Sequence, residues 1–255
     1  YILEVLGEDN NPFLISGSGK NSRLDKIVHS LMVVPLKIKD EIFGVASAFS
    51  FREDKFFNEK DIYYMNFIAQ KAAFAIENIG LYDVIVENLF STLQSFVTAL
   101  EVRDLYTRKH SERVAKFALL TAKKMGCSEE ELRNIEFAGS LHDIGKIGIR
   151  DDILLKPGKL TEEEYQKIKE HPAIGADIIG KVGLWDQEME IIRHHHERFD
   201  GGGYPDGLKG DEIPKLARIL FVADSYDAMA SDRAYRKKIE KSEVINTIKE
   251  CSGTQ

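Results

Sequence analysis

A helical pattern in the middle of the chain constrains the fold more than any other feature. Beginning near Asn58, apolar residues recur at alternating steps of three and four. The pattern lasts for about 45 residues, on the order of 65 Å at 1.5 Å per residue. We therefore expect one long helix that links an N-terminal half of the chain to a C-terminal half.

The apolar positions of this helix form a heptad seam. A seam of this kind pairs with a second helix, and a polar residue on it can fix the register at some cost in stability. We expect a homodimer joined through a parallel stalk, and the alternative is a helix that packs only on its own two domains. The seam consists of Ile62, Met65, Ala69, Ala72, Ile76, Ile79, Asp83, Val86, Phe90, Leu93, Val97 and Leu100, and only Asp83 is polar.

The N-terminal half carries a strand pattern. Two apolar runs rich in β-branched residues extend from Leu31 to Ile38 and from Ile42 to Phe51. The polar residues 39–41 separate them, so the pattern predicts two strands joined by a short turn in a small sheet.

The C-terminal half has helix signals after Asp104 and no strand pattern. Capping boxes and glycines mark the helix ends, and a residue that precedes proline disfavours the α conformation. We expect helix ends to recur beside the histidines, where ligands can point to a shared centre. Thr107 opens a helix that runs through Lys124 and ends at Gly126, and Ser128 with Glu131 opens one that reaches His142 and stops at Gly145 and Gly148. Thr161 with Glu164 opens a third helix, which ends near His171 because Pro172 follows. A further helix is expected from Leu216 to Ala230.

Charge and cysteine content narrow the class of protein. The net charge of -7 disfavours a groove for a nucleic-acid polymer, which needs clustered Lys and Arg. The two cysteines, Cys127 and Cys251, form no CxxC pair, so we expect free thiols and a reducing cytoplasm. Neither a membrane-spanning run nor a signal peptide is evident, and the abrupt ends suggest that some of the native protein is missing.

Histidines are concentrated in the C-terminal half, where six of the seven lie between positions 110 and 196. Imidazole and carboxylate groups are ligands for Fe, Mn and Zn, and such metals make water nucleophilic near neutral pH. So many polar groups are costly to bring together without a cation. We therefore expect a metal hydrolase site, and we expect His194 to be a buried structural residue. The candidate ligands are His110, His142, Asp143, His171, His195, His196 and Asp224.

The order of these residues resembles a known enzyme family. His110, the pair His142-Asp143, and Asp224 follow the order of the HD phosphohydrolase superfamily, over about Leu100 to Gln255. Two further motifs make the match more specific, and the chain is similar to HD-GYP domains. The resemblance implies an all-α metal phosphodiesterase domain at residues 105–255 that hydrolyses cyclic di-GMP to pGpG and, by a second cut, to GMP. The two motifs are His195-His196-Glu197-Arg198 and Gly203-Tyr204-Pro205.

The same resemblance implies the division of the ligands. Asp143 would bridge two divalent metals, Fe or Mn, which hold a hydroxide in line with the phosphorus atom. We expect no third metal, since Tyr106 replaces a glutamate that serves one in some members. One metal would be held by His110, His142 and Asp224, and the other by His171, His195 and His196.

Substrate contacts are also implied by the resemblance. Lys146 would stabilise the phosphate as a catalytic residue together with Asp143, and Tyr204 offers a ring for base stacking. The loop that contains Tyr204 is also a candidate surface for protein partners. The remaining expected contacts are Asp227, Arg233 and Arg236.

The N-terminal half is similar to the closing part of a GAF domain over about residues 25 to 80. This implies an antiparallel sheet flanked by helices that binds an unknown small ligand or mediates dimerisation. The expected organisation is α+β: an incomplete GAF-like domain at 1–80, a signalling helix at 58–104, and the HD-GYP domain. Two alternatives stay open, a catalytically weak cyclic dinucleotide receptor or docking module, and an enzyme for another cyclic dinucleotide. The motifs are Val34-Pro35-Leu36-Lys37-Ile38, Gly44-Val45, Phe57 with Asp61, Ile68-Ala69 and Ala75-Ile76-Glu77-Asn78.

Overall fold

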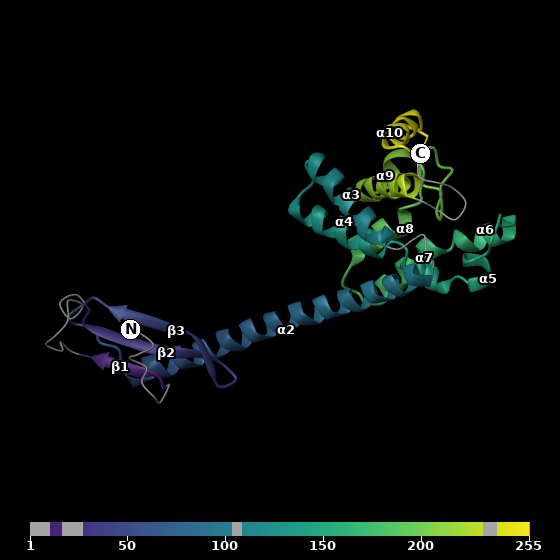
Figure 1. Cartoon of the computed structure of the whole chain (residues 1–255). Coiled ribbons are helices and arrows are strands. Elements are labelled where there is room, and N and C mark those ends of the chain that lie inside the picture. The colour runs from purple at the N-terminus through teal and green to yellow at the C-terminus, as the bar shows by residue number, and fades with distance from the viewer. Residues whose placement is uncertain (1–10, 17–27, 104–108, 232–238, 255) are drawn as a thin grey trace. The chain divides into compact units, whose positions relative to one another are not determined.

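The computed structural model describes residues 11–16, 28–103, 109–231 and 239–254. It divides into two compact units, residues 1–88 and 89–255, and each is described by itself. Helix α2 (Glu59–Arg103) contributes to both units and runs for 45 residues, as the sequence pattern predicted (Figure 1). Asn58 starts it: its side chain accepts a hydrogen bond from the backbone N–H of Lys60 at 2.8 Å, and Asp61 accepts from the N–H of Asn58 at 2.9 Å.

The first unit contains a three-stranded antiparallel sheet in the order β1 (Phe13–Ser16), β2 (Ser30–Ile38) and β3 (Glu41–Ser50). The two strands expected from sequence are β2 and β3, each within one residue of its expected bounds. Strand β1 was not expected, because four residues are too few to show an alternating pattern. The sheet buries Val33 and Val34, and α2 buries Ala69 and Ala73. The sheet and helices confirm the α+β class, while the GAF resemblance stays a prediction.

The regular elements among the described residues of the second unit are all helices. Helix α3 packs on α4 and α9, α7 packs on η2 and α8, and α4 also contacts α8 (Figure 1). None of the helices in the described ranges has both the length and the apolarity that a membrane crossing requires. The elements are α3 (His110–Lys124), α4 (Glu129–Leu141), the 3-10 helix η2 (Ile144–Gly148), α5 (Asp151–Leu154), α6 (Glu162–Ile168), α7 (His171–Gly180), α8 (Asp186–His194), the 3-10 helix η3 (Gly210–Glu212), α9 (Lys215–Ala230) and α10 (Lys241–Glu250).

Both expected capping boxes are present. The hydroxyl of Ser128 accepts from the N–H of Glu131, whose carboxylate accepts from the N–H of Ser128 at 2.8 Å. Thr161 and Glu164 make the same reciprocal pair at the start of α6. These local signals place the starts of α4 and α6 correctly because the partners lie within one turn.

Two helix boundaries differ from the expectation. Helix α3 begins at His110, while Thr107 lies outside the described residues. Lys109, directly before this helix, has a left-handed backbone with φ 60°. Helix α6 ends at Ile168, and His171 opens the next helix instead of closing this one. Pro172 is accommodated there because the first turn of a helix does not need its missing N–H.

Gly145 does not stop α4, which already ends at Leu141. The glycine lies in η2, where its backbone meets the first turn of α7. A Cβ atom at this position would collide with the carbonyl oxygen of His171 and the backbone nitrogen of Gly175. The residue is therefore small so that two backbones can approach each other, and this approach brings Asp143 toward His171.

Candidate functional site

The seven candidate ligands converge in the second unit, mostly from helix ends. His110 and His171 open α3 and α7, while His142 and His195 directly follow α4 and α8. Their ligand atoms form three overlapping sets, with the atoms of each set within 4.8 Å of one another. The sets are His110 with His142 and Asp224, His142 with Asp143 and His195, and His171 with His195 and His196.

Asp143 lies between the two groups of histidines that the family resemblance distinguishes. Its Oδ1 is 3.4 Å from Nε2 of His171, in one group. Its Oδ2 is 3.8 Å from Nε2 of His110 and 3.6 Å from Nε2 of His142, in the other. The two oxygens of this carboxylate therefore face different ligand sets.

Lys146 is paired with Asp143, since its Nζ donates to Oδ2 at 2.6 Å. Burial favours the neutral form of the Asp143 carboxyl, but Lys146 and the surrounding imidazoles together hold its pKa well below the ordinary value. The carboxylate is thus ionised at neutral pH and able to bind a cation.

Three histidines are oriented by backbone carbonyls that lie close to them in the chain. The Nδ1 atoms of His142, His171 and His195 lie 2.8, 2.7 and 2.6 Å from the carbonyl oxygen three residues earlier. Since a carbonyl oxygen can only accept, each Nδ1 carries the hydrogen and each Nε2 keeps a lone pair. Those three Nε2 atoms are buried without a hydrogen-bond partner among the described residues. Buried nitrogen atoms that have a lone pair and no hydrogen-bond partner are suited to bind a pair of cations.

The second histidine group is neutral. Burial lowers the pKa of His171 to about 3 and that of His196 to about 4, and it holds the pKa of His195 well below its ordinary value. These imidazoles are therefore unprotonated at neutral pH, as metal ligands must be.

His110 differs because carboxylates from α9 hold both of its nitrogens. Its Nδ1 lies 2.7 Å from Asp227 and its Nε2 lies 3.2 Å from Asp224. Burial disfavours the charged imidazole, but these two carboxylates outweigh it and raise the pKa of His110 to about 9. The pair with Asp227 sets the orientation of the ring.

Asp227, expected from the resemblance to contact substrate, is engaged by protein groups in the structure. Its side chain is only 3% exposed, and Arg113 donates two hydrogen bonds to it, at 2.7 and 2.9 Å. The spacing of three from Asp224 does put the two residues on one face of α9, but Asp227 meets the start of α3 there. The sequence analysis did not identify Arg113 as a partner of Asp227. Its position one helical turn after His110 could have indicated that both side chains lie on the same face of the helix.

Tyr204 lies against a candidate ligand. Its ring is 4.9 Å from that of His196, between centroids, at an interplanar angle of 31°. The Nζ of Lys169 lies 5.8 Å from the Tyr204 ring centroid and 4.7 Å from that of Tyr165. This aromatic and cationic cluster adjoins the site, and the sequence analysis missed Lys169 and Tyr165.

Glu197 organises the loop after α8. Its carboxylate is buried and accepts hydrogen bonds from the backbone N–H groups of Asp206, Gly207 and Leu208 at 2.7, 3.0 and 3.1 Å. His194 is buried and bonded to Asp206 at 3.0 Å, and it belongs to none of the three ligand sets. Both residues thus support the loop that carries Tyr204.

Three residues of the expected site lie outside the described residues. They are Tyr106, Arg233 and Arg236. Their expected roles stay predictions.

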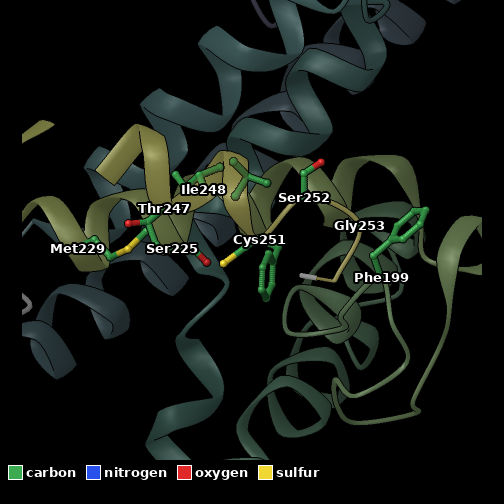
Figure 2. A pocket seen from close by; sticks show the side chains of 10 residues that line it. Phe199, Ser225, Met229, Thr247, Ile248, Cys251, Ser252 and Gly253 are labelled. Atoms are coloured by element: carbon green, nitrogen blue, oxygen red, sulfur yellow. The ribbon is translucent and has the colours of Figure 1, made fainter. Parts of the chain in front are cut away.

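An apolar pocket of about 480 Å³ lies elsewhere in the unit, between α9, α10 and the turn after α10 (Figure 2). Phe199, Met229, Ile248 and Cys251 contribute to its wall, and no candidate metal ligand does. The pocket is therefore separate from the histidine site.

Comparisons with known proteins agree with this geometry. The family model for the HD domain matches residues 95–255, more than half of the chain. The chain is 49% identical over 148 residues to the cyclic di-GMP phosphodiesterase response regulator RpfG of Xanthomonas campestris, covering 57% of this chain and 39% of that protein. It is 46% identical over 167 residues to a cyclic di-GMP phosphodiesterase of Thermotoga maritima, covering 65% of this chain and 45% of that protein.

The helical fold also matches a solved structure. The crystal structure of a cyclic GMP-AMP specific phosphodiesterase of Vibrio cholerae aligns with a TM-score of 0.50 at 20% identity, covering 65% of this chain and 45% of that one. The chain spans less than half the length of each of these three proteins.

Proposed function

The chain belongs to the HD domain family, and from this premise we propose that it is a metal-dependent phosphodiesterase that hydrolyses cyclic di-GMP to pGpG and, by a second cut, to GMP. The observation that carries the proposal is the convergence of six histidine and aspartate ligands around Asp143. The names of the Xanthomonas and Thermotoga relatives support the choice of substrate.

The ligand set fits two divalent cations. We assign one to His110, His142 and Asp224, and the other to His171, His195 and His196, with Asp143 shared between them. Fe and Mn both suit a mixed imidazole and carboxylate shell. Bound there, the cations would supply Lewis acidity toward phosphate oxygens and make water nucleophilic near neutral pH.

The chain's own residues orient the substrate and balance its charge. The Lys146 ammonium is paired with Asp143, and it would donate to a nonbridging phosphate oxygen as negative charge develops on it. The Tyr204 ring lies against that of His196 and would also stack on a base of the substrate. Arg233 and Arg236 would bind the rest of the dinucleotide.

The wider organisation is part of the same proposal. Residues 1–80 would form the GAF-like sensor for a small ligand, 58–104 the signalling helix and dimer stalk, and 105–255 the catalytic domain. Cys127 and Cys251 are both free, which suits a reducing cytoplasm. The loop around Tyr204 is the candidate surface for protein partners.

The proposal is tested by anaerobic purification, elemental analysis and product chromatography after incubation with cyclic di-GMP. We expect two Fe or Mn ions per chain and the appearance of pGpG. Cyclic GMP-AMP, the nucleotide in the name of the Vibrio protein, serves as the competing substrate. Preferred hydrolysis of that nucleotide would reassign the substrate, and tight binding of cyclic di-GMP without turnover at full metal content would favour a receptor.

A further inference from the structure

A carboxylate at the end of α2 holds the backbone on both sides of His110. The Oε2 atom of Glu101 accepts a hydrogen bond from the N–H of Lys109 at 2.8 Å. Its Oε1 atom accepts one from the N–H of Ser111 at 2.7 Å. Both oxygens of one side chain are thus bonded to the residues that flank a candidate metal ligand.

The backbone at this point needs such support. Lys109 has a left-handed conformation with φ 60°, which is unfavourable for a residue with a side chain. Its own side chain makes no capping hydrogen bond to α3. Glu101 therefore caps the helix from a distance, and its negative charge suits the positive end of the helix dipole.

His110 depends on residues distant in the chain more than His142, His171 and His195 do. The rings of His142, His171 and His195 bond to carbonyls only three residues earlier in the chain. The ring of His110 is instead held by Asp227 from α9, and its backbone is held by Glu101 from α2. The position of this ligand is thus set by two other helices.

We infer that Glu101 is a positioning residue: its carboxylate fixes His110 for metal binding and so couples the last turn of α2 to the metal centre. The inference rests on the metal role proposed above for His110. A change at the end of α2 would act on the metal held by His110, His142 and Asp224, and would leave the other ligand group in place.

Glu101 can be changed without opening the apolar core. It lies on the wall of a groove of about 440 Å³ between α2 and α3, which Lys109, Ser111 and Ser140 also line. Truncating its side chain removes two hydrogen bonds into this groove.

The test is calorimetric titration of the full metal-free chain with Mn²⁺. Glu101→Ala is expected to weaken one of two Mn²⁺ sites by about tenfold or more, the effect typical of removing a group that supports a metal ligand. Glu101→Gln should give a smaller loss, because its amide offers one acceptor for two donors. Glu112→Ala is the matched control, since this carboxylate lies 3.7 Å from the Lys109 ammonium but is 72% exposed. It should bind Mn²⁺ as the parent does.

A second substitution separates positioning from a general loss of structure. Glycine adopts the left-handed conformation freely, so Lys109→Gly should restore part of the affinity in the Glu101→Ala background and change the parent little. Unchanged binding in Glu101→Ala, an equal loss in Glu112→Ala, or no rescue by Lys109→Gly would each overturn the inference. If the parent binds two Mn²⁺ ions and shows the Glu101 effect but does not hydrolyse cyclic di-GMP, the proposed function fails and the coupling stands.

Discussion

Asp143 is the residue on which both ligand groups depend, because its two oxygens face different histidines. Asp143→Ala is therefore expected to abolish hydrolysis and to lower the content of both metals together, as measured by elemental analysis of the purified protein. Asp152→Ala is the control, since that exposed carboxylate pairs with Arg150 and belongs to none of the three ligand sets. Full activity at unchanged metal content in Asp143→Ala would reject the shared-ligand assignment.

Asp227 is expected to contribute to the stability of the fold. Asp227→Ala leaves His110 and Arg113 without their shared carboxylate, so the free energy of unfolding should fall by about 1.5 to 3 kcal/mol, the range for a hydrogen bond to a charged group. Urea unfolding of the metal-free parent and variant measures this change in the free energy of unfolding. A residue that contacts only substrate would instead leave stability unchanged and weaken the binding of cyclic di-GMP.

The loop after α8 is the element most dependent on one side chain. Three consecutive backbone N–H groups bond to Glu197. In Glu197→Ala those amides lose their acceptor, and we expect residues 206–208 to exchange hydrogen at least about tenfold faster while α4 exchanges as before. Glu212→Ala, on the exposed 3-10 helix η3, is the comparison. Equal protection in Glu197→Ala and the parent would show that the loop is held by other contacts.

Elements were predictable where their signals are local. The capping pairs Ser128 with Glu131 and Thr161 with Glu164 lie within single turns, and the period of α2 extends over its whole length. The grouping of the seven ligands came from the family order and not from spacing. The contact of Asp227 with α3 and that of Glu101 with Lys109 could not be predicted, because they depend on how separate helices pack.

At the scale of the whole molecule, the seam of α2 is buried in one part and exposed in another. Phe90 stacks on Phe137 of its own unit at 4.9 Å between centroids, and Leu93 and Val97 are buried. Ile76 and Ile79 are instead 47% and 63% exposed. The C-terminal end of the seam thus packs within its own unit, in line with the alternative that the helix packs on its own domains. The middle of the seam is exposed and could contact a second copy of the chain.

The dimer prediction follows from that exposed part. Ile76→Lys combined with Ile79→Lys should yield monomers, because it places charges on the seam without disturbing the Phe90 contact. Light scattering measures the mass, and Glu87→Lys, a charge change on the same helix off the seam, should leave it unaltered. A monomeric parent, or a charged variant with the parent's mass, would remove the stalk from the proposal.

Gly145 shows how closely η2 approaches the first turn of α7, where His171 lies. The backbone at Gly145, two residues after Asp143, lies directly against the carbonyl of His171, and there is no space for even one methyl group between them. The spacing of Asp143 from His171 is therefore limited by excluded volume. A change as small as glycine to alanine would shift these two side chains relative to each other while every candidate ligand remained in the sequence, so an intact set of ligands does not by itself guarantee a working centre.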